Sequence, residues 1–330
     1  MKFKNIIGID VGKNSIDFSV LENGEKKLQG QVENSVKKLT LFLTSLKVDF
    51  AETLFCMEHT GIYNFHLLNV LQSRHAKIWL ENPVQIKRSI GLTRGKNDKI
   101  DAIRISKYAY LHQEKAKIWE PTRHVIESLK LLMGLRSRLN KAKKLIEIPV
   151  AEAKEFISKE NFKLMKQNCK STLAGIKKDL EQVTIKIKEI VNSDETLKEL
   201  FSYVSSVPNV GLITATAIIV STNEFKKINT ARQFACHAGI APFEYSSGSS
   251  IRGKTRISHM ADKELKTFLH LATLSAVSRP GELRDYFVRK VQEGKNKMLV
   301  INAIRNKLVH RVFACVRDQK KYIKKDLTFA

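Results

Sequence analysis

Residues 4–12 read KNIIGIDVG, a run rich in β-branched side chains that ends in an aspartate and a glycine. Such a run predicts a buried strand. The following stretch, SIDFSVLE (15–22), alternates apolar and polar residues, and Asn23-Gly24 is a dipeptide that closes hairpins. KKLQGQVE (26–33) predicts one more strand. The chain is therefore expected to begin with three consecutive strands.

Helices and strands alternate after these three strands. Asn34 or Ser35 can cap a helix, because their side chains accept hydrogen bonds from its first N–H groups. The later elements predicted are a strand over ETLFCMEH (52–59), a helix over 62–74, a strand over AKIWLEN (76–82) and a helix over 98–111. This order of elements is that of the RNase H-like fold, so residues 1–120 are predicted to form an α/β domain.

Residues 121–200 have a different composition, with much lysine, glutamate and leucine and little glycine or proline. One series of apolar residues recurs at alternating spacings of three and four, which predicts a coiled-coil seam. Its members are Leu173, Ile176, Leu180, Val183, Ile187, Ile190 and Leu197. An earlier stripe from Leu129 to Leu139 could pack against it antiparallel. The spacing leaves open whether the helices pair within one chain or between chains.

Residues 201–330 are predicted to be mostly helical, with amphipathic helices over 262–277 and 296–317. SSVPNVG (205–211) predicts a turn before a helix of small residues, similar to a helix–hairpin–helix element. Backbone N–H groups near Asn209 and Gly211 would then face a nucleic-acid phosphate. A tight turn between two helices, with no ligand, fits the same residues equally well.

The charge balance indicates a polyanionic partner. Lysine and arginine number 58 against 33 acidic residues, a net charge of +25, and nucleic acid is the simplest partner for such a chain. A cationic surface kept for solubility and acidic lipid are the alternatives. The four cysteines are too far apart in sequence for a zinc site or a disulfide framework. No apolar run is long enough to span a membrane. These features predict a cytoplasmic protein.

Four acidic residues stand where a metal-dependent nuclease would need them. Asp10 and Glu58 end the first and fourth predicted strands, which are neighbours in an RNase H-like sheet. Asp98 and Asp101 are three residues apart and share one face of a helix. Grouped carboxylates repel each other unless a cation lies between them, and Mg²⁺ or Mn²⁺ suits oxygen ligands. Each acid alone also has a structural explanation, in a turn, on the surface or at a helix start.

The segment EYSSGSSIRGKTR (244–256) combines hydroxyl groups with cations and is predicted to be a loop. A hydroxyl attacks phosphorus only when it loses its proton and nearby charge neutralises the phosphate. Arg252, Lys254 and Arg256 would supply that charge. A basic loop that merely contacts DNA is the alternative. Chemistry alone does not choose the nucleophile among Tyr245, Ser246, Ser247, Ser249 and Ser250.

Several motifs resemble the DEDD-type transposases of insertion sequence family 110, which are relatives of the Piv/MooV DNA invertases. The resemblance covers nearly the whole chain, and its last motif is the most specific. The motifs are IGIDVGKNSIDFSVL (7–21), MEHTGIY (57–63), RGKNDKIDA (94–102), SSVPNVGLITATA (205–217) and ARQFACHAGIAPFEYSSGSSIRGKTRIS (231–258).

The resemblance implies a role for each candidate residue. It places the family's metal-binding acids on Asp10, Glu58, Asp98 and Asp101, and its nucleophilic serine on Ser247. It also implies an RNase H/RuvC-like domain (1–120), a coiled-coil arm (121–200) and a C-terminal transposase domain (201–330). Acids and serine would form one composite site, in which the serine joins DNA covalently.

The resemblance further implies the partners of the protein. A structured non-coding bridge RNA would pair with donor and target DNA, so that base pairing reads sequence while the protein binds backbone and shape. Joining several DNA ends needs several active sites, which implies a dimer or a tetramer. A bacterial, nucleoid-associated protein is expected.

Three other functions fit part of the pattern. A RuvC-like nuclease or Holliday junction resolvase would use the same acids to activate water. A non-catalytic nucleic-acid-binding protein would need the charge alone, and its function would survive Asp10→Ala. An actin-like ATPase shares the first glycine motif but needs a second glycine-rich phosphate loop, and the chain contains no Gly-Gly pair.

Overall fold

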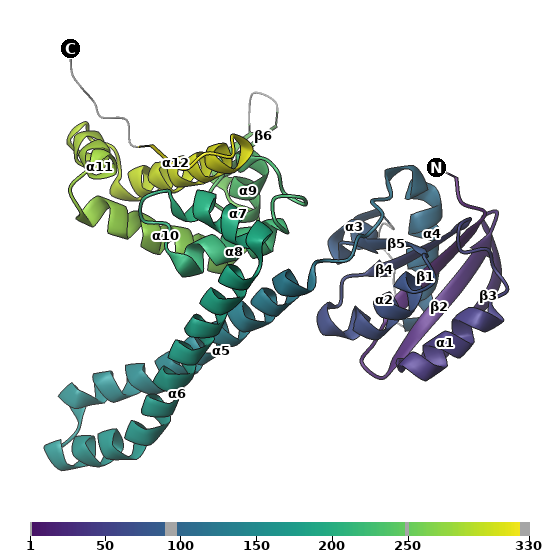
Figure 1. Ribbon diagram of the computed structural model, residues 1–330, viewed down its shortest axis with the longest axis horizontal. Coiled ribbons are helices and arrows are strands. Elements are labelled where there is room, and N and C mark those ends of the chain that lie inside the picture. The colour runs from purple at the N-terminus through teal and green to yellow at the C-terminus, as the bar shows by residue number, and fades with distance from the viewer. Residues whose placement is uncertain (1, 90–97, 248–250, 324–330) are drawn as a thin grey trace. The chain divides into compact units, whose positions relative to one another are not determined.

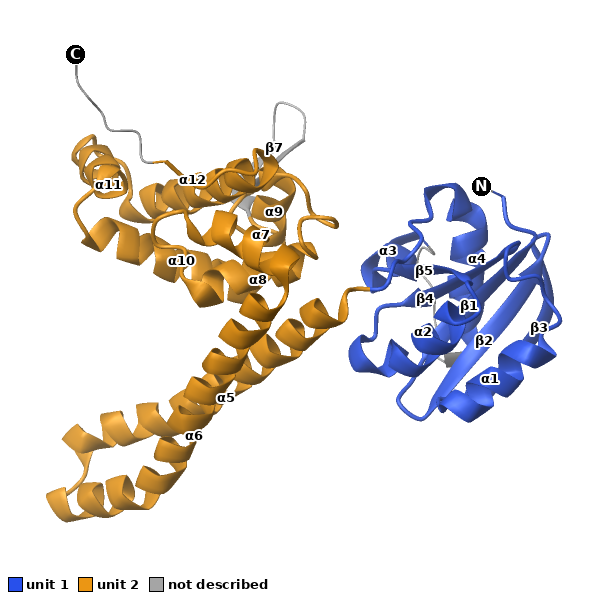
Figure 2. Ribbon diagram, viewed as in Figure 1, with its two compact units in different colours: residues 1–121 blue, residues 122–330 orange. Residues whose placement is uncertain are grey.

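The structure, a computed structural model, describes residues 2–89, 98–247 and 251–323, and of residues 98–99, 243–247 and 251–256 it describes the backbone only. The chain divides into two compact units, residues 1–121 and 122–330 (Figure 2). Within the described residues, no helix has both the length and the apolar composition needed to cross a bilayer.

The first unit is built on a five-stranded mixed sheet (Figure 1). Its strands are β1 (Asn5–Val11), β2 (Ser15–Glu22), β3 (Glu25–Glu33), β4 (Thr53–Glu58) and β5 (Lys77–Glu81), in the order β3-β2-β1-β4-β5. β1 pairs antiparallel with β2 and parallel with β4. The predicted strands and the adjacency of the first and fourth strands are therefore confirmed.

Both faces of this sheet are covered by helices. On one face α1 (Val36–Ser45) and α2 (Phe65–Gln72) bury an apolar core that includes Ile7, Ile9 and Phe55. On the other face α3 (Pro83–Ser89) and α4 (Asp98–His112) enclose a second core with Ile6, Cys56 and Trp79. This two-sided burial explains why β1 and β4 are apolar along almost their whole length. Short 3₁₀ turns, η1 (Gly61–Asn64) and η2 (Gln113–Lys115), precede α2 and follow α4.

The second unit is helical except for one hairpin. Its elements are α5 (His124–Phe156), α6 (Lys159–Ser193), α7 (Glu195–Ser205), α8 (Leu212–Thr222), α9 (Ala231–His237), β6 (Phe243–Ser247), β7 (Ile251–Arg256), α10 (Lys263–Ser278), α11 (Glu282–Gln292) and α12 (Lys297–Arg317). α5 and α6 run antiparallel and pack along each other (Figure 1). Helices α7 to α12 surround one apolar core.

The predicted heptad seam is interrupted between Ile190 and Leu197. α6 ends at Ser193, and Asp194 caps the next helix by accepting a hydrogen bond from the backbone N–H of Leu197 at 2.8 Å. Arg123 holds the same carboxylate, with its Nη2 2.5 Å from Asp194 Oδ1. Leu197 thus belongs to α7 and lies in the helical core. Whether α5 and α6 form a coiled coil with a second copy stays a prediction.

The serine-rich segment differs from the predicted loop. Residues 243–247 and 251–256 form two antiparallel strands, with Tyr245 opposite Gly253 and Ser247 opposite Ile251. Aromatic and β-branched residues at 243, 245, 251 and 255 account for the pairing, because such side chains favour extended backbone. Helices α9 and α11 were also not expected.

Candidate active site

Gly8 lets a helix approach the centre of the sheet. A Cβ atom on this residue would lie 2.2 Å from Ser106 N and 2.5 Å from Ala102 O, both backbone atoms of α4. The side-chain hydroxyls of Ser106 and Ser19 also meet, at 3.2 Å. Only a glycine allows this contact. It sets α4 against β1 two residues before Asp10.

Four carboxylates lie side by side across four neighbouring strands. Asp10 on β1 is directly opposite Asp17 on β2. Glu58 at the end of β4 is opposite Glu81 at the end of β5. The β1–β4 register pairs Ile9 with Met57, so Asp10 and Glu58 come next on the neighbouring strands. Opposed residues share a face of the sheet, and this face is the one that α4 covers.

Asp101 adds a carboxylate from α4. The pKa of Glu58 is raised by burial and by the negative charges of Asp10 and Asp101. The charge effect requires Asp10 and Asp101 each to lie near Glu58. The strand order predicted this proximity for Asp10. Arg104 donates from Nη1 to Asp101 Oδ1 at 2.8 Å and balances part of this charge. Asp98 begins the same helix one turn earlier, and its side chain lies outside the described residues.

Two asparagines hold the loops that follow the acidic residues. The buried Asn64 donates to the backbone oxygen of Glu58 at 2.9 Å and accepts from the N–H of Thr60 at 2.9 Å. Asn34 donates to the backbone oxygens of Gly12 at 2.9 Å and Tyr63 at 3.0 Å. The loop after β1 is thereby tied to the turn after β4. These bonds fix the strand ends that carry Asp10 and Glu58.

Asp17 and Glu81 are not among the predicted site residues, although they lie on the same face of the sheet as Asp10 and Glu58. Counting the hairpin register from the turn after β1 would have placed Asp17 opposite Asp10. Asp17 is buried, and Gln31 donates to its Oδ2 at 3.0 Å while Oδ1 has no hydrogen-bond partner. Glu81 accepts from the Tyr108 hydroxyl at 3.0 Å.

The donor set suits a hard divalent cation. Asp10, Glu58 and Asp101 offer carboxylate oxygens, which Mg²⁺ and Mn²⁺ prefer, and their mutual repulsion is what a bound cation would relieve. Among the side chains that the structure describes, no three acids, histidines or cysteines are arranged as a ready metal-ligand group. The carboxylate of Asp98 is not among those side chains.

Gly8→Ala is expected to disrupt this arrangement. The added methyl group would collide with the backbone of α4, which must then move and carry Asp101 away from Asp10. We expect a loss of about 2–3 kcal/mol in the free energy of unfolding, the usual cost of overpacking, measured by urea denaturation. Gly175→Ala on α6 is the control, because its Cβ would meet nothing within 4 Å. Equal stability of Gly8→Ala and the wild type would contradict the close packing.

Glu58→Gln is expected to stabilise the protein when no divalent cation is present. The pKa of Glu58 is raised in the folded state. Ionisation of Glu58 therefore destabilises the fold as pH rises through the folded-state pKa. Below the ordinary glutamate pKa of about 4.3 the carboxyl is protonated in both states, and this destabilisation is absent. We expect a gain of about 1 kcal/mol at pH 8, on the order of one relieved charge repulsion. The gain should shrink as pH falls toward 4.

Urea unfolding in EDTA measures this difference, and Glu33→Gln, at an exposed position at the end of β3, is the control. Adding Mg²⁺ at pH 8 should stabilise the wild type by about 2.7 kcal/mol when the ion is at a hundred times its dissociation constant. Glu58→Gln should gain less. A Glu58→Gln protein that is less stable than the wild type in EDTA would show that the acids do not repel each other.

The second unit carries the other predicted site residues. Ser247 ends β6, and Arg252, Lys254 and Arg256 lie on β7, so the hairpin brings their backbones together. Their side chains lie outside the described residues. Asn209 has φ +70°, the left-handed conformation expected for the PNVG turn, and Ser275 donates to its Oδ1 at 3.2 Å. Gly211 precedes α8 as its N-cap.

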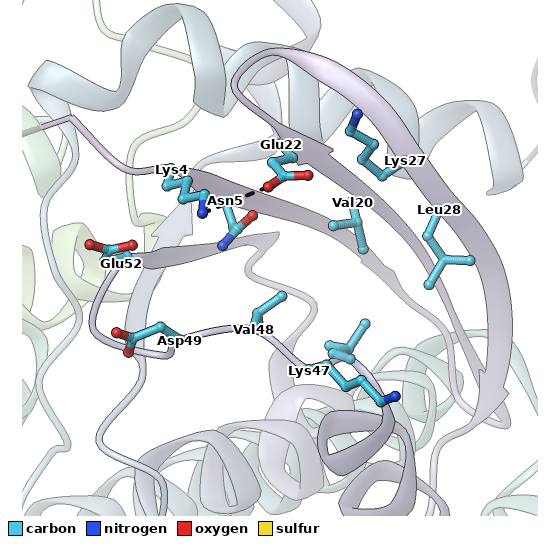
Figure 3. A pocket seen from close by; sticks show the side chains of 11 residues that line it. Lys4, Asn5, Val20, Glu22, Lys27, Leu28, Lys47, Val48, Asp49 and Glu52 are labelled. Atoms are coloured by element: carbon cyan, nitrogen blue, oxygen red, sulfur yellow. Dashed lines mark ion pairs between the residues drawn. The ribbon is translucent and has the colours of Figure 1, made fainter.

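A separate pocket lies at the other end of the sheet (Figure 3). It has a volume of about 270 Å³ and is lined by residues that include Asn5, Val20 and Leu28. Lys4 Nζ lies 3.8 Å from Glu22 Oε1 at its edge. Asn5 begins β1, whereas Asp10 stands near the end of that strand. The pocket is therefore distinct from the acidic site.

Two family models match the chain. The model of the IS110 DEDD transposases, described as a transposase, matches residues 7–144. The model described as the transposase IS116/IS110/IS902 family matches residues 202–288. The first match includes the five strands and α4. The second includes the Asn209 turn and the serine hairpin.

Known proteins resemble the chain over different lengths. The pilin gene-inverting protein of Moraxella bovis is 26% identical over 329 residues, which cover 98% of each chain. The insertion element IS110 43.6 kDa protein of Streptomyces coelicolor is 28% identical over 118 residues, 36% of this chain and 29% of that protein. Among solved structures, T. thermophilus RuvC in complex with a Holliday junction substrate matches 35% of this chain and 99% of its own, with 12% identity and a TM-score of 0.30.

Proposed function

The chain belongs to the IS110 family of DEDD transposases and is a DNA recombinase, and on this premise we propose how its residues cut and rejoin DNA. The observation that carries the proposal is the group of acids on one face of the sheet. Asp10 and Glu58 stand on adjacent strands, and Asp101 acts on the pKa of Glu58 from α4. Burial and the charges of Asp10 and Asp101 raise the pKa of Glu58, and a bound cation would relieve the repulsion between these acids.

We propose that Asp10, Glu58, Asp98 and Asp101 hold one or two divalent cations, Mg²⁺ or Mn²⁺. A cation bound there would supply positive charge against the oxygens of the reacting phosphate. The carboxylates would bind the ion, and the close contact of Gly8 with α4 keeps the helix that carries Asp98 and Asp101 against β1.

Ser247 is the proposed nucleophile. Its Oγ loses a proton and bonds to phosphorus, and the bond between phosphorus and a deoxyribose oxygen breaks, which leaves a free DNA hydroxyl and a phosphoserine ester. A hydroxyl of the other DNA strand then attacks the ester, regenerates the serine and joins the strands. Arg252, Lys254 and Arg256 on the partner strand β7 would bind phosphate oxygens.

A structured bridge RNA would choose the two DNA sites, and a dimer or tetramer would supply enough active sites.

A strand-exchange assay tests this function. Purified protein, with the RNA that copurifies with it, is incubated with plasmids that carry the DNA flanking its gene, and joined products are sequenced. Recombined junctions that require a divalent cation are expected. Cut DNA with free ends and no joined product would favour a nuclease that uses water, and bound DNA with neither cut nor join would favour a non-catalytic binding protein.

A further inference from the structure

Arg305 is a buried cation whose hydrogen-bond partners, among the described residues, are neutral. It lies on α12 with only 5% of its surface exposed. Its Nη2 is 2.7 Å from His270 Nδ1 on α10, and its Nη1 donates to Asn302 Oδ1 at 3.3 Å. Its Nε is buried and has no hydrogen-bond partner. An arginine cannot give up its proton to escape such a site, so the charge stays in the interior.

Two more groups share this environment. Lys266 lies one helical turn before His270 on α10, and both are half-buried. Burial and the charge of Arg305 lower the pKa of Lys266, and burial, Arg305 and Lys266 lower the pKa of His270. Because a guanidinium only donates, His270 Nδ1 must accept, and the ring proton is therefore on Nε2. Lys266 Nζ and His270 Nε2 are thus both hydrogen-bond donors.

No acid balances this cluster among the residues that the structure describes. Burial alone accounts for the lowered pKa of Arg305. The acids that begin α10 act elsewhere. Burial lowers the pKa of His237 and of Arg136, and the charges of Asp262 and Glu264 oppose these two shifts respectively. Burying a charge without a counter-charge destabilises a fold. The arrangement is explained if an anion from outside the chain completes it.

The cluster stands at the base of the serine hairpin. Asn302, which accepts from Arg305, donates from Nδ2 to the backbone oxygen of Ile240 at 2.8 Å. Ile240 is buried and precedes β6 by three residues. α10 begins shortly after β7 ends. An anion at Lys266 and His270 would therefore lie near Ile240, from which the chain leads into β6.

We propose that Lys266, His270 and Arg305 form a binding site for a phosphodiester group of the nucleic-acid strand that reaches this hairpin. The inference rests on the proposed function, which brings a strand to Ser247. Lys266 Nζ and His270 Nε2–H donate to phosphate oxygens. Arg305 is a positioning residue. It fixes the tautomer of His270 and, from its buried position, adds positive charge near the phosphate.

Binding of fluorescent twenty-nucleotide strands, dT20 and rU20, tests this site by anisotropy across a range of NaCl concentrations. Lys266→Gln is expected to weaken binding about three- to tenfold and to reduce the slope of log Kd against log salt by about 0.7, the value for one phosphate contact on a single strand. His270→Gln should weaken binding in the same direction. A loss confined to dT20 or to rU20 would identify DNA or RNA as the ligand.

Lys307→Gln is the matched control. Lys307 lies on α12 two residues beyond Arg305, is exposed, and its Nζ is 4.6 Å from the centre of the Tyr286 ring. Lys307→Gln removes the same charge as Lys266→Gln, but it should leave the slope of log Kd against log salt unchanged. Wild-type binding by both Lys266→Gln and His270→Gln would overturn the inference and leave Arg305 as a link between α10 and α12. Strand exchange and its dependence on Ser247 would be unaffected by that result, so the proposed function is tested separately.

Discussion

Asp10→Asn and Asp101→Asn are each expected to lower the rate of strand exchange by at least about a thousandfold. Both changes remove one negative oxygen from the group that raises the pKa of Glu58 and that would bind the cation. A cation contributes several kcal/mol to transition-state stabilisation, and about 1.4 kcal/mol corresponds to tenfold in rate. Quantitative sequencing of joined DNA measures the effect.

Nucleic-acid binding separates loss of chemistry from loss of structure in this test. Both variants should bind DNA at least as well as the wild type, because they remove negative charge from a protein with a net charge of +25. Glu33→Gln, which removes an exposed carboxylate at the far edge of the same sheet, should recombine normally. Recombination by Asp101→Asn at the wild-type rate would show that α4 contributes no metal ligand.

Ser247→Ala is expected to abolish both strand exchange and the covalent protein–DNA product. If the hydroxyl forms the bond to phosphorus, nothing in alanine replaces it, and loss of a nucleophile lowers the rate by about a thousandfold or more. Denaturing gel electrophoresis of labelled DNA detects the covalent product, and DNA binding should persist.

Ser246→Ala is the control for the hairpin, since Ser246 is the neighbouring residue of β6. It should retain the adduct and most of the strand exchange. If Ser246→Ala or Tyr245→Phe loses the adduct while Ser247→Ala keeps it, the nucleophile has been placed on the wrong residue. If Ser247→Ala still cuts DNA, and the ends are free, water is the nucleophile.

The first unit was predictable in outline because its strands are read from local sequence. β-branched runs and the Asn23-Gly24 turn are enough to place β1, β2 and β3. The expected pairing of the first and fourth strands then places Asp10 beside Glu58. What the residues did not indicate was the depth at which α4 packs. Helix α4 can pack this closely because Gly8 has no side chain. The reason for a glycine at this position is apparent only from the three-dimensional contact of Gly8 with the backbone of Ser106 and Ala102.

The second unit was less predictable because composition and spacing there fit more than one local structure. Dense serine and glycine favour a loop, but cross-strand pairing made 243–247 and 251–256 a hairpin. The heptad spacing follows one helix, α6, up to Ile190 and then crosses Asp194, whose capping bond to Leu197 starts a new helix. His270 and Arg305 are 35 residues apart, and no local pattern predicts their contact.

Mass spectrometry of the protein–DNA adduct tests the central claim most directly. DNA is incubated with the protein in Mg²⁺ or in EDTA, digested with nuclease and protease, and the nucleotide-bearing peptide is sequenced. A nucleotide on Ser247 that forms in Mg²⁺, is absent in EDTA and is absent from Asp101→Asn is the predicted result. Cleaved DNA with no modified peptide, or a modification on Ser247 that forms equally well in EDTA, would contradict it.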